Sequence, residues 1–249
     1  MKSGKKIAVV TGALGGIGTA IVDSFLSNGV VVIATIRPGS SQRATDWKKK
    51  RFDNNEHLHL LEVDVADHSS CEKLIAQVKE QFGRLDILVN NAGITRDSSI
   101  KKMSFEQWNE VINTNLTGCF NMCKLAFTLM QSNGYGRIIN ISSVNGQKGQ
   151  FGQVNYAASK SGIYGLTKSL ALEGARKGIT VNSISPGYIR TEMTSKIAPK
   201  ILDTIISEIP VGRMGEPEEV AETVLFLASE KSAFITGSNL AMNGGQHLY

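Results

Sequence analysis

Hydrophobic and polar positions along the chain follow two alternating patterns. Short apolar runs such as Ile7-Ala8-Val9-Val10 are typical of buried strands, and longer segments repeat apolar residues at helical spacing, as Ile17, Ile21 and Phe25 do. The pattern predicts strands near 6–11, 30–36, 58–64, 85–90, 136–142, 179–185 and 238–242. It predicts helices near 17–28, 68–82, 104–132, 155–177 and 217–228, with a short helical stretch around 198–207.

Strands that alternate with helices in this way predict an α/β fold. We expect a Rossmann-like doubly wound parallel sheet of about seven strands, with helices on both faces. No internal repeat or low-complexity linker divides the 249 residues, so we expect a single domain over 1–249. Pro186-Gly187 ends the sixth strand, and the stretch from Tyr188 to Pro210 has the polar, broken pattern of a mobile lid.

The charge and the apolar runs of the chain limit the classes of partner that we expect. The formal charge of +5 is modest, and we interpret its densest cationic cluster, Lys48-Lys49-Lys50-Arg51, as a solvated face. No basic stripe interleaved with aromatic residues indicates nucleic acid, and no apolar run approaches the length of a membrane span. The N-terminal apolar run is broken at once by glycines, which excludes a secretory signal. We therefore expect a cytoplasmic protein without nucleic-acid or membrane partners.

The metal-binding residue types are too sparse to predict a metal site. Cys71, Cys119 and Cys123 lack the spacing of a metal site and are interpreted as free thiols in a reducing cytoplasm. His57 and His59 share one face of a predicted strand, but the sequence supplies no further ligands beside them.

A glycine cluster directly follows the first predicted strand and opens a helix. It reads Thr11-Gly12-Ala13-Leu14-Gly15-Gly16-Ile17-Gly18. At such a helix start, backbone N–H groups point at an anion whose approach larger side chains would block. This context predicts that the turn binds the phosphates of a dinucleotide.

The segment from Asn140 to Lys160 carries the candidate catalytic chemistry. It contains the hydroxyl of Ser143, the phenol of Tyr156 and the ammonium of Lys160. On a helix, the i,i+4 spacing of Tyr156 and Lys160 places both on one face. A phenol beside an ammonium can exchange protons near neutral pH, whereas an isolated tyrosine, with a pKa of about 10, cannot.

The same tyrosine–lysine spacing occurs a second time, at Tyr164 and Lys168. Ser143 lies thirteen residues before Tyr156, but the same offset from Tyr164 falls on Phe151. Tyr156 also lies nearer the start of its helix, where open α/β sheets place their sites. We therefore assign the chemistry to Tyr156 and interpret Tyr164 as a packing residue.

Over nearly its full length the chain resembles the short-chain dehydrogenase/reductase family. The family's T-G-x-x-x-G-x-G motif is matched from Thr11 to Gly18, its N-N-A-G motif by Asn90 to Gly93, and its nicotinamide-binding segment by Pro186-Gly187 with Thr191. The resemblance implies a catalytic tetrad of Asn115, Ser143, Tyr156 and Lys160. The cofactor contacts that we expect are Gly12, Leu14, Gly16, Ile17, Gly18, Arg37, Arg43, Asp64, Val65, Asn91, Ala92, Gly93, Tyr156, Lys160, Pro186, Gly187, Ile189 and Thr191.

These residue types suit reduction of a carbonyl by hydride from a nicotinamide. Ser143 and Tyr156 would hydrogen-bond the carbonyl oxygen as negative charge develops there, and Tyr156 would deliver the proton as general acid. Lys160 would favour the tyrosinate and, by the resemblance, bind the nicotinamide ribose. Asn115 would hold a water that links Lys160 to solvent.

The end of the second predicted strand indicates which dinucleotide is used. A fold that selects NAD carries an acidic residue there, whereas this strand runs into Arg37, with Arg43 close behind. A guanidinium matches the 2′-phosphate of NADPH, which we expect as cofactor. Many NADP-using relatives carry a basic residue within the glycine turn, where this chain has Leu14-Gly15. Arg37 as an ordinary surface charge is the alternative.

The substrate expectation rests on a further resemblance within the family. The loop from Val144 to Gln153, together with Gly93 to Asp97 and Asn243 to His247, resembles the acetoacetyl-CoA reductases of polyhydroxybutyrate synthesis. This implies a homotetramer that reduces acetoacetyl-CoA to (R)-3-hydroxybutyryl-CoA. The implied substrate contacts are Asp97, Ser143, Gln150, Phe151, Gln153 and Tyr188.

Two alternatives stay open from the sequence. A 3-oxoacyl-[acyl-carrier-protein] reductase would share the fold, the cofactor and the tetrad. A dinucleotide-binding sensor without turnover is the more distant one, because such a chain would be expected to lose the tyrosine or the lysine.

Overall fold

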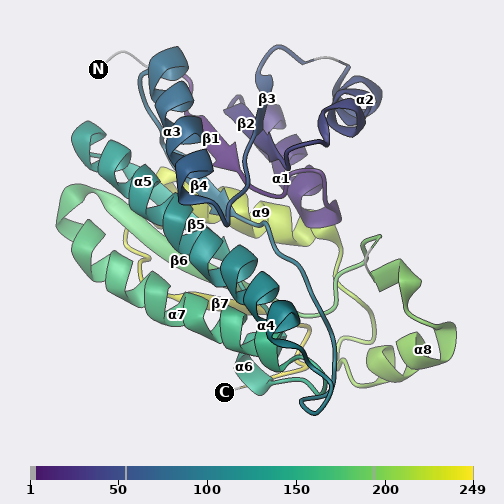
Figure 1. Ribbon diagram of the computed structural model, residues 1–249. Coiled ribbons are helices and arrows are strands. Elements are labelled where there is room, and N and C mark those ends of the chain that lie inside the picture. The colour runs from purple at the N-terminus through teal and green to yellow at the C-terminus, as the bar shows by residue number, and fades with distance from the viewer. Residues whose placement is uncertain (1–3, 54, 193, 249) are drawn as a thin grey trace.

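The computed structural model describes residues 4–53, 55–192 and 194–248. Within them, seven strands form one parallel sheet in the order β3-β2-β1-β4-β5-β6-β7 (Figure 1). The strands are β1 (Ile7–Val10), β2 (Val31–Ile36), β3 (Leu58–Glu62), β4 (Ile87–Asn90), β5 (Gly136–Ile141), β6 (Ile179–Pro186) and β7 (Asn239–Met242). The predicted doubly wound fold is confirmed.

Helices cover both faces of this sheet. They are α1 (Gly16–Ser27), α2 (Ser41–Phe52), α3 (His68–Phe82), α4 (Phe105–Ile112), α5 (Gly118–Asn133), α6 (Val144–Lys148), α7 (Val154–Gly174), α8 (Pro199–Ser207) and α9 (Pro217–Ala228). In Figure 1, α3, α5 and α7 lie in front of the sheet, and α1 and α9 lie behind it. None of the described helices is both long and apolar enough to cross a membrane.

The alternation of side chains along each strand divides the core into two layers. Val9 and Ile33 pack with α3, α5 and α7 on one face, whereas Val10 and Val32 pack with α1 and α9 on the other. Because both faces are buried, central strands such as β1 and β2 contain nearly continuous apolar runs rather than alternating ones.

Two helices were not predicted. Only Ala44 and Phe52 are buried in α2, so this polar helix has no apolar stripe at helical spacing to reveal it. The cluster Lys48-Lys49-Lys50-Arg51 lies on α2, and Lys48 donates a hydrogen bond to the carbonyl of Leu58. The other unpredicted helix is α6, which has only five residues, within the loop that follows β5.

The helix predicted over 104–132 is interrupted. A π-helical turn, Asn113–Thr117, separates α4 from α5. The residues on either side of this turn, Ile112 and Gly118, keep a right-handed helical backbone, so the range predicted as one helix covers both helices. The expected lid, from Tyr188 to Pro210, contains a 3₁₀ turn, Thr194–Lys196, and α8. Met193 lies outside the described residues.

Candidate active site

The candidate site lies at the carboxyl ends of the central strands. The chain leaves β1 toward β2 on one side, whereas β4 pairs with β1 on the other, so the strand order reverses between them. In open α/β sheets, ligands bind at such a switch point. The glycine turn follows β1, the Asn91–Gly93 segment follows β4, and Ser143 follows β5.

The glycine turn is locked to the segment after β4. The Thr11 hydroxyl accepts hydrogen bonds from the backbone N–H groups of Asn91 and Ala92, both at 3.0 Å. In return, Asn91 Nδ2 donates to the carbonyls of Thr11, at 3.1 Å, and Gly12, at 2.9 Å. The pattern predicted the turn, but Thr11 as the residue that holds it was missed.

Close packing explains two of the glycines. Gly12 adopts a φ of 63°, and a Cβ there would lie 2.9 Å from the Cα of Ala92. A Cβ on Gly18 would lie 2.3 Å from the carbonyl oxygen of Gly12. In the described structure no side chain caps the start of α1, which follows this turn. The turn therefore fits the pyrophosphate of a dinucleotide, which the first amides of α1 would hold.

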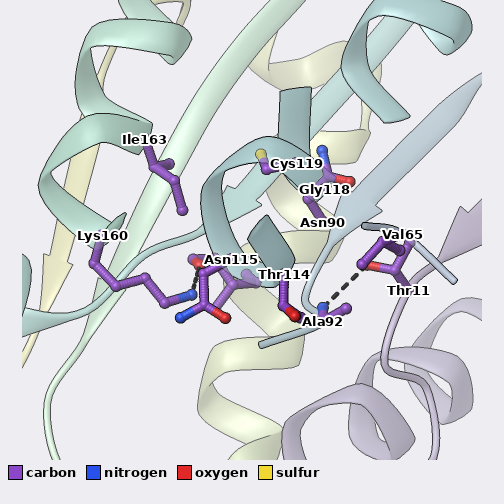
Figure 2. A pocket seen from close by; sticks show the side chains of 11 residues that line it. Thr11, Val65, Asn90, Ala92, Thr114, Asn115, Gly118, Cys119, Lys160 and Ile163 are labelled. Atoms are coloured by element: carbon purple, nitrogen blue, oxygen red, sulfur yellow. Dashed lines mark hydrogen bonds between the residues drawn. The ribbon is translucent and has the colours of Figure 1, made fainter. Parts of the chain in front are cut away.

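A small cavity between these segments contains both expected and unexpected residues (Figure 2). Its lining residues are Thr11, Val65, Asn90, Ala92, Thr114, Asn115, Gly118, Cys119, Ile141, Lys160 and Ile163. Thr114, Gly118, Cys119, Ile141 and Ile163 were not predicted as site residues. Gly118 is explained by contact, since a Cβ there would lie 2.8 Å from Cγ2 of Val65.

Lys160 is buried, although it carries an amine. It extends from α7 toward Asn115 (Figure 2), and its Nζ donates a hydrogen bond of 2.8 Å to the carbonyl of Ile141. Nζ lies 5.6 Å from the centroid of the Tyr156 ring. Burial lowers the pKa of Lys160 to about 8, and nearby Cys119 acts weakly in the opposite direction. The lysine is therefore close to Tyr156 and can titrate within a physiological range.

The environment of Tyr156 favours the protonated phenol. Burial raises the pKa of Tyr156, a hydrogen bond with Ser143 opposes this shift, and the Asp97 carboxylate adds to it. Ser143 caps α6, because its hydroxyl accepts a hydrogen bond of 3.1 Å from the backbone N–H of Asn145. The structure thus brings Ser143, Tyr156 and Lys160 together.

Asn115 lies in the π-helical turn with its side chain fully engaged. Its Oδ1 accepts from the N–H of Ile94 at 2.8 Å, and its Nδ2 donates to the Ile94 carbonyl at 3.0 Å and to the Ser159 hydroxyl at 3.2 Å. A Cβ on Gly93 would lie 3.3 Å from Asn115 Oδ1 and 3.5 Å from Lys160 Nζ. Asn115 is therefore beside Lys160, and its amide clamps the segment after β4.

The second tyrosine–lysine pair has different surroundings. The Tyr164 hydroxyl donates to the carbonyl of Ser143 at 2.9 Å and shares a hydrogen bond of 3.0 Å with the Ser185 hydroxyl on β6. Lys168 is exposed. This arrangement suits a tyrosine that joins α7 to the sheet.

Other residues expected to contact the cofactor lie near the glycine turn and differ in how far they are buried. Thr191 contacts it directly, since a Cβ on Gly16 would lie 2.7 Å from Thr191 Cγ2. Leu14 and Ile17 are partly buried against the core layer beneath α1. Ile189 is buried and pairs with Gly215.

Hydrogen bonds that involve a backbone group hold the candidate cofactor residues that follow β3 and β6. Asp64 Oδ1 accepts from the N–H of Ala66 at 3.0 Å, and the carbonyl of Val65 accepts from Asn121 Nδ2 at 3.0 Å. After Pro186, the N–H of Gly187 donates to the Met242 carbonyl at 2.9 Å.

The two arginines expected at the 2′-phosphate are both exposed. Arg37 directly follows β2, and Arg43 lies on α2, the helix that was not predicted. Arg43 also lies 3.9 Å from Glu192 in the expected lid. Because both guanidinium groups are exposed, they are accessible to the 2′-phosphate of a bound dinucleotide.

The expected substrate residues lie on two loops that touch each other. The N–H of Ser98 donates to the Gly152 carbonyl at 2.8 Å, and Gln153 Nε2 donates to Asp97 Oδ2 at 2.8 Å. Asn145, which was not predicted, donates to Gln153 Oε1 at 3.0 Å. These contacts join the loop after β4 to the loop after β5.

The other substrate candidates differ in burial. Gln150 is exposed, and Phe151 has 89% of its surface exposed. Tyr188 is partly buried, and its pKa is raised by burial, then by the carboxylates of Glu208 and Asp97. Among the described residues, no cluster of three His, Cys, Asp or Glu side chains could hold a metal ion.

Comparison with known proteins agrees with this geometry. A family model described as enoyl-(acyl carrier protein) reductase matches residues 12–247. The chain is 53% identical to an acetoacetyl-CoA reductase of Rhizobium meliloti, over 98% of this chain and 99% of the relative. It is 47% identical to an acetoacetyl-CoA reductase of Cupriavidus necator, with the same coverage, and 43% identical to the 3-oxoacyl-[acyl-carrier-protein] reductase FabG of Vibrio harveyi, over 98% of both chains.

Together, the parallel sheet, the glycine turn at its switch point and the full-length similarity identify the chain as a nicotinamide-dinucleotide oxidoreductase, and it belongs to the short-chain dehydrogenase/reductase family.

Proposed function

We propose that this chain reduces acetoacetyl-CoA to (R)-3-hydroxybutyryl-CoA with NADPH. The observation that carries the proposal is the buried Lys160 ammonium beside the Tyr156 phenol and the Ser143 hydroxyl. These groups lie at the carboxyl ends of the central strands, next to the glycine turn. The relatives named acetoacetyl-CoA reductases, at 47 and 53% identity, support the choice of substrate.

The mechanism assigns one task to each member of the tetrad. When bound, NADPH supplies the hydride. Ser143 and Tyr156 donate hydrogen bonds to the substrate carbonyl oxygen, and Tyr156 gives up its proton to that oxygen. Burial raises the pKa of Tyr156 and so keeps it protonated until substrate accepts the proton. The Lys160 ammonium then stabilises the resulting tyrosinate, because the two groups lie on one helix face.

Asn115 completes the tetrad by holding the loop that carries Gly93 and Ile94 next to Lys160. We propose that a water beside it links Lys160 to solvent, so that the proton leaving Tyr156 is replaced. The amide of Asn115 already binds Ile94 and Ser159, so its role includes fixing the geometry of the relay.

The preference for NADPH rests on Arg37 and Arg43. Both guanidinium groups are exposed, and β2 ends without a carboxylate that would bind the ribose 2′-OH of NAD. The test compares kcat/KM for NADPH and NADH in the wild type and in an Arg37→Ala, Arg43→Ala double variant. We expect the wild type to prefer NADPH and the variant to lose that preference. Equal efficiency of the wild type with both cofactors would contradict the proposal.

A carrier-protein reductase is the second candidate, and the similarity to the Vibrio harveyi enzyme favours it. The deciding measurement is kcat/KM for acetoacetyl-CoA against acetoacetyl-carrier protein at equal NADPH, because the ratio reports discrimination in the transition state. A strong preference for the carrier-protein substrate would replace the first candidate with the second. Turnover of neither would favour the dinucleotide-binding sensor.

The remaining expectations complete this proposal. The chain would form a single domain over 1–249, assemble as a homotetramer and supply polyhydroxybutyrate synthesis in the cytoplasm. Large apolar side chains exposed on the outer helices, Phe120 on α5 and Leu172 on α7, support an interface between copies. Light scattering coupled to size-exclusion chromatography tests the assembly, and a monomer at micromolar concentration would contradict it.

A further inference from the structure

Asn155, the residue before Tyr156, is completely buried in the first turn of α7. Its Nδ2 donates to the carbonyls of Arg96 and Gln107, both at 3.1 Å, and its Oδ1 accepts from the N–H of Tyr156 at 2.8 Å. A side-chain amide has two N–H donors and one carbonyl acceptor. Both donors and the acceptor of Asn155 are thus used, and one side chain joins three segments.

Each of the three segments bears on the site. Arg96 directly precedes Asp97, which accepts the hydrogen bond from Gln153. Gln107 belongs to the capping box that fixes the start of α4 with Ser104. The N–H of Tyr156 is among the first amides of α7, which have no backbone carbonyl partner within their own helix. Asn155 therefore connects two segments to Tyr156, which carries the phenol. One is residues 94–97, which contain Asp97 and are called the substrate loop here, and the other is α4.

A second contact holds the other side of the Tyr156 backbone. The Ser159 hydroxyl donates to the Tyr156 carbonyl at 2.8 Å and accepts from Asn115 Nδ2. Asn115 in turn clamps Ile94, which lies in the same loop as Arg96. Two independent paths thus tie Tyr156 to residues 94–97.

We propose that Asn155 is a positioning residue that sets the place of the Tyr156 phenol relative to the substrate loop at Asp97. The proposal rests on the function proposed above, and it gives Asn155 no contact with substrate or cofactor. Loss of the amide would let the loop and the helix start move apart. A displacement of about 1 Å at a reacting group can cost about 100-fold in rate.

The first test is Asn155→Ala, with Asn182→Ala as matched control. Asn182 in β6 is also buried, donates to the Ile235 carbonyl at 2.8 Å and accepts from the N–H of Ser238 at 3.1 Å, away from the tetrad. We expect both variants to lower Tm. Only Asn155→Ala should lower kcat/KM for acetoacetyl-CoA, by about 10- to 100-fold, with the Kd for NADPH unchanged within about twofold.

Asn155→Asp tests the role of Asn155 through the pH dependence of kcat/KM, which a purely structural role would not change. The carboxylate keeps an acceptor for the Tyr156 N–H but turns an oxygen toward the carbonyls of Arg96 and Gln107. Protonation would restore one donor. We therefore expect kcat/KM of Asn155→Asp, relative to wild type, to rise as the pH falls. The same ratio for Asn155→Ala should stay flat.

Hydrogen exchange of residues 94–98 and 154–158 tests the link without any substrate. Asn155→Ala should accelerate exchange in both segments, and Asn182→Ala in neither. If wild type turns over acetoacetyl-CoA but the two alanine variants match in kcat/KM, the inference is wrong. If wild type does not reduce acetoacetyl-CoA, the proposed function fails, and unchanged exchange in Asn155→Ala then overturns the inference separately.

Discussion

Helix α7 carries two tyrosine–lysine pairs with identical spacing and opposite surroundings. At the first pair, Lys160 is 4% exposed and lies next to the ring of Tyr156. The hydroxyl of Tyr156 forms a hydrogen bond with Ser143. At the second, Lys168 is exposed, and Tyr164 donates to a backbone carbonyl. The i,i+4 spacing of tyrosine and lysine is therefore not sufficient to form a candidate active site. What distinguishes the first pair is the buried ammonium beside a phenol that hydrogen-bonds the Ser143 hydroxyl.

The difference follows from what lies beside each turn of the helix. At Lys160, α6 approaches so closely that a Cβ on Gly146 would lie 2.9 Å from the Lys160 backbone. The Ser142 hydroxyl also donates to the Lys160 carbonyl at 2.8 Å. One turn beyond Tyr164, Thr167 accepts from Asn140 Nδ2 at 3.0 Å, so this part of α7 packs along β5. The first pair lies at the end of the sheet and the second along its side.

The largest expected effect comes from removing the two phenols separately. Tyr156→Phe deletes the proposed proton donor, so turnover should fall about 10²- to 10⁴-fold while folding and NADPH binding survive. Tyr164→Phe loses only hydrogen bonds to Ser143 and Ser185, and its turnover should stay within a few-fold of wild type. Steady-state kinetics and NADPH titration of both variants check this. Equal losses in two folded variants would contradict the distinction between the pairs.

Removing the two ammonium groups sharpens the same comparison. Lys160→Met deletes the charge that we propose stabilises the tyrosinate, and kcat should fall about 10²-fold. Lys168→Met deletes an exposed charge and should leave kcat unchanged. The two variants are compared by kcat at saturating acetoacetyl-CoA and NADPH. A similar loss in both would mean that burial of Lys160 is not what matters.

Burial of Lys160 should also appear in the stability of the protein. Its pKa of about 8 in the folded protein lies below the 10.5 of a free lysine, so between these values the unfolded chain binds more protons. The contribution of Lys160 to the free energy of unfolding should therefore rise with pH across this window, by up to about 3 kcal/mol. Below pH 8 both states are protonated and this contribution is constant. Urea unfolding of wild type and Lys160→Met at pH 7 and 10 isolates this contribution as the difference in slope between them, because buried Tyr156 titrates in both proteins.

The smallest effect is expected in the pH dependence of reduction. The proposed mechanism needs a charged Lys160 beside a protonated Tyr156, and the lysine loses its proton first, near pH 8. Because this pKa belongs to the protein without substrate, kcat/KM should fall about tenfold per pH unit above that value. Lys168→Met should keep the same profile. A profile that stays level to pH 9.5 would show that Lys160 remains charged at a higher pH than its burial implies.

Several features could be predicted from the sequence because local chemistry determines them. Continuous β-branched runs such as Val31–Ile36 predict strands buried on both faces, and the glycines at 12 and 18 are needed wherever the turn packs against another backbone. The residue types of the tetrad and its i,i+4 spacing are likewise properties of the chain. Polar α2 was missed because its contacts involve only two buried side chains.

Only the tertiary structure decided which of the two pairs has its lysine buried and which residues hold its tyrosine. Lys160 and Lys168 have the same local pattern, and only packing against α6 and β5 buries the first. Likewise, the bonds of Asn155 to Arg96 and Gln107 span 59 and 48 residues. Hydrophobic periodicity reports on neighbours within a helix or strand, whereas burial of a charge and long-range polar contacts depend on segments that only the folded sheet brings together.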